Sequence, residues 1–111
     1  EYAYAASDLV VCRSGATTMA EVTSRGLPAI LVPYPHATGG HQYKNAEVLQ
    51  AMGAAYLILE EDLTPEKLKT TILGLITNKS FLKRMAEKSK TLGKPQATRK
   101  VVKLIFSLVN Q

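Results

Sequence analysis

Three short apolar runs, each followed by a helical pattern, constrain the fold more than any other feature of this sequence. The runs cover residues 9–12, 29–32 and 55–59, and none of them alternates with polar residues. Strands that are covered on both faces have this uninterrupted apolar composition. We therefore expect an α/β fold with a small sheet of three parallel strands.

Helices are expected between these runs. The first covers residues 17–25 and ends before Gly26 and Pro28, and the second covers 42–52 and ends before Gly53. Glycine just after a helix, with proline just beyond, is a typical termination signal. The resulting β-α-β-α-β order requires right-handed crossovers. In a doubly wound sheet of order 3-2-1-4-5-6, these strands would be the last three, with the first half of the domain missing.

The N-terminal flank supports the same interpretation. Glu1 is not an initiator Met and no signal peptide follows it, which indicates a piece of a longer protein. Residues 2–7 resemble a helical run, which leaves the strand over 9–12 with an exposed apolar edge. From this edge we expect self-association between copies of the chain.

The second half of the chain is predicted to be helical. Thr64 and Pro65 fit the N-cap and the first position of a helix. Ser80 is expected to cap a second helix that ends near Gly93, and residues 96–110 repeat the amphipathic pattern. The acidic run over 60–62 is interpreted as the approach to the Thr64 helix, the alternative being a metal–nucleotide site. Because no linker or repeat is found, residues 1–111 are expected to form a single domain.

Composition and charge limit the possible partners. The chain has 111 residues, of which 46% are hydrophobic and 21% charged, as in one globular domain or a piece of one. Residues 1–59 carry three basic and four acidic residues, a balance of −1, whereas residues 60–111 carry eleven and five, a balance of +6. The basic half is expected to form a solvated helical face, or else a contact with an anionic membrane surface or with another domain. No nucleic-acid-binding signature is present, so we expect no nucleic acid partner.

The loop after the first strand is a candidate ligand site, because ligands of open α/β sheets bind beyond the carboxyl ends of the strands. A helix N-terminus there attracts an anion, and small residues let the anion approach the backbone. The alternative is a turn that only caps its helix. The loop and the start of its helix contain Cys12, Arg13, Ser14, Gly15, Ala16, Thr17 and Thr18.

Glu21 has two interpretations. It follows Thr18 by three residues, as in a capping box. Alternatively, its carboxylate accepts hydrogen bonds from the vicinal hydroxyls of a ribose. Thr17 and Thr18 likewise either donate hydroxyls to a phosphate or only occupy the first helical turn.

The loop after the second strand leads to Gln42 and Asn45. These residues are three apart, so their amides point the same way on a helix and can be offered to sugar hydroxyls. The alternative is that they only cap the second helix. Cys12, His36 and His41 lack a fourth ligand at a suitable spacing, so we expect no metal. The absence of P-loop, G-x-S-x-G and GxGxxG motifs disfavours kinases, hydrolases and dehydrogenases.

Three motifs together closely resemble the MurG family, the peptidoglycan N-acetylglucosaminyltransferases that convert lipid I to lipid II. The match is dense over residues 8–59 and rests on the helical pattern alone over 60–111. The motifs are Asp8-Leu9-Val10-Val11-Cys12-Arg13-Ser14-Gly15-Ala16-x-Thr18-x-x-Glu21, Gly26-Leu27-Pro28-Ala29-Ile30-x-Val32-Pro33-Tyr34-Pro35-His36-Ala37 and His41-Gln42-x-Lys44-Asn45-Ala46.

The resemblance implies the second half of the C-terminal, donor-binding domain of a GT-B glycosyltransferase, a half-Rossmann unit that binds UDP-N-acetylglucosamine. By analogy with the family, Glu21 would hold the ribose hydroxyls of UDP. Ala16, Gln42 and Asn45 would meet the hydroxyls of N-acetylglucosamine. Thr18, with the helix N-terminus over residues 14–17, would face the diphosphate. His41 would also contact the sugar, at a place where family members vary.

The resemblance also implies what this chain does not carry. No metal or cofactor is expected, because GT-B enzymes are generally metal-independent, and the general base and the lipid I acceptor are associated with the N-terminal domain. The chain alone is therefore expected to be inactive and at most a weak donor-binding module. The parent enzyme would be cytoplasmic and peripheral on the inner face of the bacterial cell membrane.

Two other interpretations stay open. One is a small donor-binding subunit that works with a separate membrane-anchored partner, as in the eukaryotic enzyme that adds the second N-acetylglucosamine to dolichol-diphosphate. The other is a non-catalytic structural fragment, which would not bind UDP.

Overall fold

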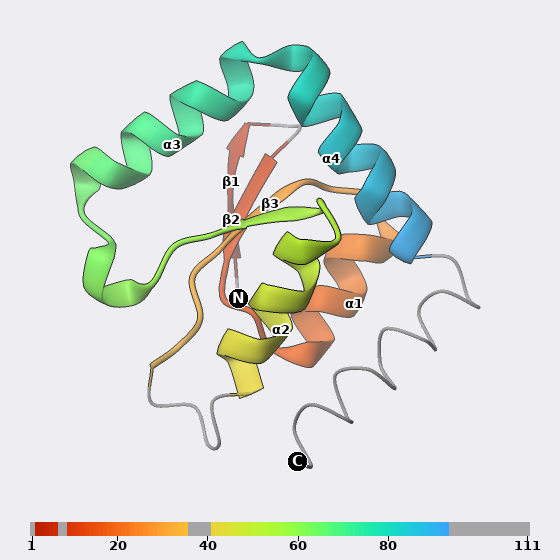
Figure 1. The fold of residues 1–111 in the computed structure, drawn as a ribbon, viewed down its shortest axis with the longest axis horizontal. Coiled ribbons are helices and arrows are strands. Elements are labelled where there is room, and N and C mark those ends of the chain that lie inside the picture. The colour runs from red at the N-terminus through yellow and green to blue at the C-terminus, as the bar shows by residue number, and fades with distance from the viewer. Residues whose placement is uncertain (1, 7–8, 36–40, 94–111) are drawn as a thin grey trace.

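The computed structural model describes residues 2–6, 9–35 and 41–93 (Figure 1). The helix expected over 96–110 lies outside these residues. The elements are, in chain order, β1 (Tyr2–Ala6), β2 (Leu9–Cys12), α1 (Ala16–Ser24), β3 (Ala29–Leu31), α2 (His41–Ala51), β4 (Ala55–Leu57), the short 3-10 helix η2 (Glu60–Asp62), α3 (Pro65–Thr77) and α4 (Lys79–Leu92).

The sheet has the strand order β1-β2-β3-β4, in which β2, β3 and β4 are parallel. This confirms the three-stranded parallel sheet and the α/β class predicted from the apolar runs. β3 and β4 end slightly earlier than predicted, although Val32 N–H still donates to Cys12 O at 2.9 Å. At the outer edge of β4, Leu57 N–H donates to the Gln50 side-chain Oε1 at 2.7 Å.

The prediction of a helix over residues 2–7 is wrong. Residues 2–6 form β1, which pairs antiparallel with β2 through the partners Tyr2↔Cys12 and Tyr4↔Val10. Tyrosine and alanine alternate with a period of two in this segment, which is the pattern of a strand. The same pairing satisfies the outer edge of β2. That edge is therefore not bare, and the expected self-association loses its basis.

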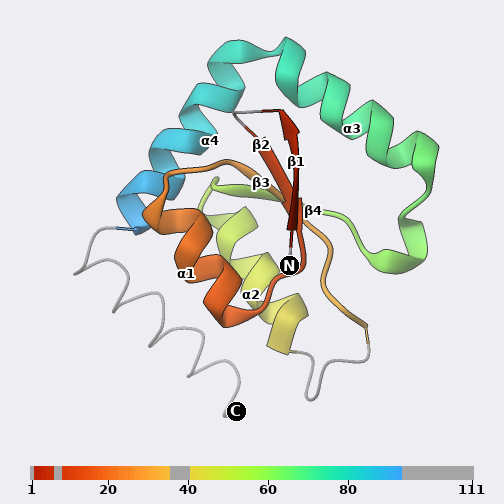
Figure 2. The same ribbon diagram turned by 180° about the vertical axis from the view of Figure 1, so that it is seen from behind.

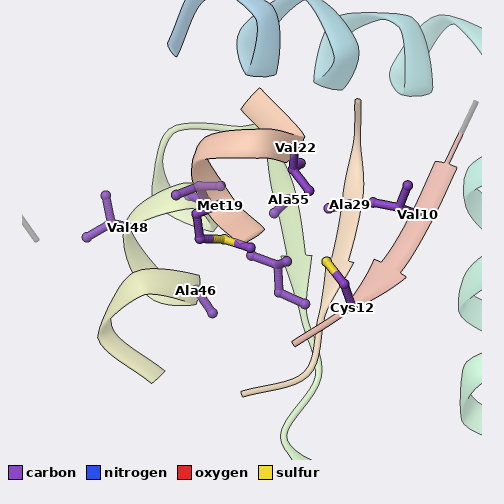
Figure 3. Packing of buried hydrophobic residues seen from close by; sticks show 10 residues of the cluster. Val10, Cys12, Met19, Val22, Ala29, Ala46, Val48 and Ala55 are labelled. Carbon is purple, nitrogen blue, oxygen red and sulfur yellow. The ribbon is translucent and has the colours of Figure 1, made fainter. Parts of the chain in front are cut away.

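Helices cover both faces of the sheet, as Figures 1 and 2 show from opposite sides. Alternate residues of each strand face opposite layers. On one face, Val10, Cys12 and Leu31 pack with α1 and α2 residues such as Met19 (Figure 3). On the other face, a second cluster joins strand residues to α3 and α4; its buried members are Leu9, Ile30, Val32, Ile58, Leu75, Leu82 and Met85. Burial on both sides explains why the strands lack polar alternation.

Glycines end the two crossover helices as predicted. Gly26 and Gly53 have positive φ angles of 65° and 78°, a conformation that glycine adopts without steric cost. Beyond α1, Leu27 N–H donates back to Val22 O at 3.1 Å, so the last turn of the helix is closed before β3 begins.

The N-cap of α3 is the predicted residue, whereas the N-cap of α4 is not. The Thr64 hydroxyl accepts from Lys67 N–H at 3.0 Å, which confirms the predicted N-cap of α3. The prediction that Ser80 caps α4 is wrong, because α4 already starts at Lys79 and Asn78 Oδ1 accepts from Phe81 N–H at 3.3 Å. None of the helices in the described part of the chain is long and apolar enough to cross a membrane.

Candidate functional site

The carboxyl ends of β2, β3 and β4 lie at one edge of the sheet, because these strands are parallel. The loop after β2 leads into α1, and the segment after β3 leads towards α2. The residues predicted to bind a ligand therefore lie at this edge, which we call the carboxyl rim. They are Ser14, Gly15, Ala16, Thr17, Thr18, Glu21, His41, Gln42 and Asn45.

The N-terminus of α1 is open at the carboxyl rim. Gly15 is the N-cap and has no side chain to accept a hydrogen bond. The first bond of the helix joins Met19 N–H to Gly15 O at 2.9 Å, so the N–H groups of Ala16, Thr17 and Thr18 precede the helical ladder. Ala16 and Thr17 are exposed and Thr18 is half-buried. This end of the helix can approach an anion through its backbone and its positive dipole end.

The capping-box interpretation of Glu21 is wrong. The helix begins at Ala16, so Thr18 is its third residue and not its N-cap. The Glu21 carboxylate instead lies 3.4 Å from the Arg25 guanidinium, and its side chain is 42% exposed. Glu21 lies roughly 9 Å along the helix axis from the N-cap Gly15, at 1.5 Å per residue. Helical spacing places Thr17 and Thr18 on the same side of α1 as Glu21.

Two hydrogen bonds join the turn after β2 to the start of α2. The Ser14 hydroxyl donates to Gln42 O at 2.6 Å, and Asn45 Nδ2 donates to Ser14 O at 2.8 Å. Ser14 is completely buried and Asn45 is 3% exposed, so solvent does not compete for these bonds. The two turns that the sequence singled out thus form one unit.

Gln42 occupies the junction of this unit with the segment after β3. Its Oε1 accepts from Tyr34 N–H at 2.8 Å, so Nε2 is the amide atom left to donate to other groups. A Cβ built on Gly15 would lie 3.7 Å from this Nε2, which places it over the first turn of α1. The alternative that Gln42 and Asn45 only cap α2 is wrong, because their side chains bind Tyr34 and Ser14.

Asn45 has a different environment from the one expected. Its Nδ2 holds the Ser14 carbonyl, while its buried Oδ1 has no hydrogen-bond partner among the described residues. An amide that is buried in this way suits positioning of the Ser14 turn better than direct contact with a ligand. His41, the first residue of α2, is half-buried at the rim. Their contacts with a sugar stay predictions.

Two cavities lie beside the predicted residues, on the β4 side of the rim. The larger, of about 490 Å³, is lined by Tyr43, Tyr56, Leu57, Ile58, Leu59, Asp62 and Lys67. The smaller, of about 240 Å³, is lined by Pro33, Tyr34, Pro35, Tyr43, Leu59, Glu60 and Glu61. Neither of these two cavities is lined by Glu21 or Gln42. Tyr34 and Tyr43, two exposed aromatic residues that line these cavities, were not among the predicted site residues. Their nearness to Gln42 in the sequence is the signal that could have indicated them.

Comparison with known proteins gives consistent matches. Residues 1–101 match the model of the glycosyltransferase family 28 C-terminal domain. The chain is 50% identical over 105 residues to the UDP-N-acetylglucosamine--N-acetylmuramyl-(pentapeptide) pyrophosphoryl-undecaprenol N-acetylglucosamine transferase of Halothermothrix orenii, covering 95% of this chain and 28% of that protein. The transferase of the same name from Cupriavidus pinatubonensis is 48% identical over 102 residues, covering 92% of this chain and 28% of that protein.

A solved structure agrees with these sequence matches. The crystal structure of MurG from Acinetobacter baumannii superposes with a TM-score of 0.73 at 39% identity, covering 94% of this chain and 31% of that chain. These matches confirm the resemblance that the three motifs indicated. The chain spans less than a third of the length of these relatives.

Proposed function

We propose that this chain, which belongs to the glycosyltransferase family 28 C-terminal domain, forms part of the donor-binding domain of an N-acetylglucosaminyltransferase. The whole enzyme would transfer N-acetylglucosamine from UDP-N-acetylglucosamine to lipid I, forming lipid II in peptidoglycan biosynthesis. The relatives of this chain carry names of that transferase. The observation that carries the proposal is the place of the Gln42 side-chain amide over the open N-terminus of α1. Tyr34 N–H holds this amide through Oε1, and the Ser14 hydroxyl holds the Gln42 backbone carbonyl.

The chemistry of glycosyl transfer fits this arrangement. When the sugar leaves UDP, negative charge develops on the diphosphate, and preorganised N–H groups stabilise such charge without reorganising. The diphosphate charge would be stabilised by the dipole of α1 and by the N–H groups of Ala16, Thr17 and Thr18. Gln42 Nε2 would donate a further hydrogen bond to the nucleotide sugar. Glu21, one and a half turns along α1, would accept hydrogen bonds from the ribose hydroxyls.

The acceptor half of the reaction is assigned to other parts of the enzyme. Deprotonation of the acceptor hydroxyl needs a general base opposite the leaving group, and we place that base, with the lipid I site, in an N-terminal domain. UDP-N-acetylglucosamine, lipid I and that domain are thus the proposed partners. The isolated chain is expected to bind the donor weakly and to give no turnover with a lipid I analogue.

Replacement of Glu21 tests the proposal. In a titration of the chain with UDP-N-acetylglucosamine, Glu21→Ala should weaken binding about tenfold, because the ribose hydroxyls lose their acceptor. Thermal melting should hardly change, since an exposed pair such as Glu21–Arg25 stabilises a helix by only about 0.3–0.5 kcal/mol. Glu87→Ala, at an exposed position of α4, is the matched control and should leave both quantities unchanged. Unchanged donor affinity with a clearly lower melting temperature would assign the carboxylate a structural role.

The two rival functions give different results in the same experiments. A small donor-binding subunit would bind UDP-N-acetylglucosamine and show turnover only after a separate acceptor-binding protein is added. A non-catalytic structural fragment would not bind UDP at millimolar concentration. Binding of UDP-N-acetylglucosamine that is weakened in Glu21→Ala therefore excludes the structural fragment.

We further propose that the chain binds an anionic membrane surface. This contact would place the enzyme on the inner face of the cell membrane. α3 and α4 carry seven cations against the two carboxylates of Glu66 and Glu87; the cations are Lys67, Lys69, Lys79, Lys83, Arg84, Lys88 and Lys90. Within the described residues, none of the seven forms an ion pair. The chain should sediment with phosphatidylglycerol vesicles at low salt and be released by high salt. Equal sedimentation with neutral vesicles would contradict this.

A further inference from the structure

Arg13 lies directly after β2, and its side chain reaches the segments that follow both other parallel strands. Its Nη1 donates to Val32 O, after β3, at 3.4 Å and forms an ion pair with Glu60 Oε1 in η2, after β4. Its Cζ lies 5.1 Å from the centroid of the Tyr34 ring. One guanidinium therefore joins the ends of three adjacent strands, although the donor-binding residues include neither Arg13 nor Glu60.

The contacts of Arg13 continue to the candidate site through one residue. The backbone N–H of Tyr34, whose ring faces the guanidinium, donates to Gln42 Oε1 at 2.8 Å. Arg13 holds the chain on both sides of that N–H, through the Val32 carbonyl and the Tyr34 ring. The direction of the Gln42 amide therefore depends on where Arg13 places the Tyr34 backbone.

We propose that Arg13 and Glu60 are a positioning pair, which fixes the Gln42 amide so that Nε2 points over the first turn of α1. A ligand group at that place must then be a hydrogen-bond acceptor, such as a hydroxyl or diphosphate oxygen of a nucleotide sugar. This deepens the proposed function and rests on it for the identity of the ligand. The position of the amide itself does not depend on the ligand.

The chemistry of the pair requires arginine. A planar guanidinium can donate to a carbonyl and a carboxylate while it stacks on an aromatic ring. Lysine supplies the charge as a compact ammonium group without this planar surface. The Arg13 and Glu60 side chains are 42% and 37% exposed, and an ion pair of that exposure contributes little to stability. A role in positioning is thus separable from a role in folding.

The test compares variants at Arg13 with a matched control on α4. Arg84 also lies over an aromatic ring, with its Cζ 5.9 Å from the centroid of Phe81. α4 packs on the C-terminal end of α1, at Thr23 and Gly26, and not on the carboxyl rim (Figure 1). In ¹⁵N-labelled chain without ligand, Arg13→Met should shift the side-chain amide resonances of Gln42 and the backbone resonance of Tyr34. Arg84→Met should leave both unchanged. Glu60→Gln should shift the Gln42 amide in the same direction by less.

Titration with UDP-N-acetylglucosamine gives the second measurement. Arg13→Met should weaken binding about three- to tenfold, the loss expected for one misplaced hydrogen bond. Arg13→Lys should recover only part of it. Unchanged Gln42 resonances in Arg13→Met and Glu60→Gln would overturn the proposal, as would full recovery by lysine. If Arg13→Met does not fold, Arg13→Lys and Glu60→Gln decide the matter through the same resonances.

The two proposals fail in different ways. If wild-type chain does not bind UDP-N-acetylglucosamine, the proposed function fails, whereas the ligand-free shifts still report on the Arg13–Glu60 pair. If the chain binds the donor but Arg13→Met does not shift the Gln42 resonances, the positioning pair is refuted and the proposed function stands.

Discussion

The two faces of the sheet are held by different chemistry. On the α3–α4 face, large apolar side chains such as Leu75 and Met85 fill the space against β2, β3 and Ile58, which follows β4. On the α1–α2 face, several core residues are small, among them Ala46 and Ala55, and the core borders the polar unit at the carboxyl rim. The first face can be satisfied by many apolar combinations. The second depends on individual atoms, because its hydrogen bonds set the positions of site residues.

The largest effect is expected where α4 reaches across to α1. A Cβ added to Gly93 would lie 2.0 Å from Thr23 O and 2.8 Å from Ser24 Cα, so backbone would have to move. Gly93→Ala should lower the free energy of unfolding by about 4 kcal/mol, measured by urea denaturation. Gly74→Ala in α3, with nothing within 4 Å of its Cβ, is the control and should stabilise by about 0.5–1 kcal/mol. Equal effects at both glycines would mean that α4 does not pack closely on α1.

A pair of truncations compares the two faces directly. Leu75→Ala removes a side chain that is 7% exposed and should cost about 3 kcal/mol of stability with unchanged donor affinity at a temperature where the chain is folded. Ser14→Ala removes the hydroxyl that holds Gln42 O and should cost about 1–2 kcal/mol together with severalfold weaker binding of UDP-N-acetylglucosamine. If Ser14→Ala changed stability alone, the distinction between the two faces would not hold.

The α1–α2 face should also have its own pH dependence. Burial raises the pKa of the Cys12 thiol from 9.0 to about 11. Between those values the unfolded chain loses the thiol proton while the folded chain keeps it. The contribution to stability is therefore fully present below pH 9 and is lost as pH rises towards 11. We expect wild type to lose about 1–2 kcal/mol more than Cys12→Ala across this range, measured by urea denaturation. Parallel curves for the two proteins would contradict the burial of the thiol.

The smallest effect sharpens the description of the α3–α4 face. Asn78→Ala removes the side-chain cap of α4 and should cost about 1 kcal/mol in urea denaturation. Ser80→Ala, two residues on, should change stability by less than about 0.5 kcal/mol. A larger loss of stability in Ser80→Ala than in Asn78→Ala would show that Ser80 caps α4, as the sequence predicted.

Much of the fold was predictable because its signals are local. Apolar runs gave the three parallel strands, and Gly26, Gly53 and Thr64 marked helix ends through conformations that depend on neighbouring residues. The failures were also local: the alternation in residues 2–6 was mistaken for a helix, and Asn78 was overlooked as a cap. In both cases a short segment was compatible with two structures. Pairing with β2 made residues 2–6 a strand, and the start of α4 at Lys79 made Asn78 the cap.

The candidate site was predictable in its residue types and not in their connections. Motifs selected Ser14, Gln42 and Asn45, yet the bond from Ser14 to Gln42 spans 28 residues and exists only after folding. Sequence spacing could not show that Asn45 is buried. The spacing of four residues between Glu21 and Arg25 did indicate their ion pair, but the capping-box interpretation overlooked it. Arg13 was quoted as part of a motif, but its three contacts come from segments that only the sheet brings together.

The side chain of Gln50 gives β4 an ending of its own. Its Oε1 already accepts from Leu57 N–H, the group that a further strand would use for its first backbone bond. An incoming strand would have to break a bond inside the molecule before gaining one between molecules. Adding a strand on this side therefore exchanges one hydrogen bond for another, with little net gain in free energy. Through this one bond, Gln50 makes β4 a poor template for fibril growth.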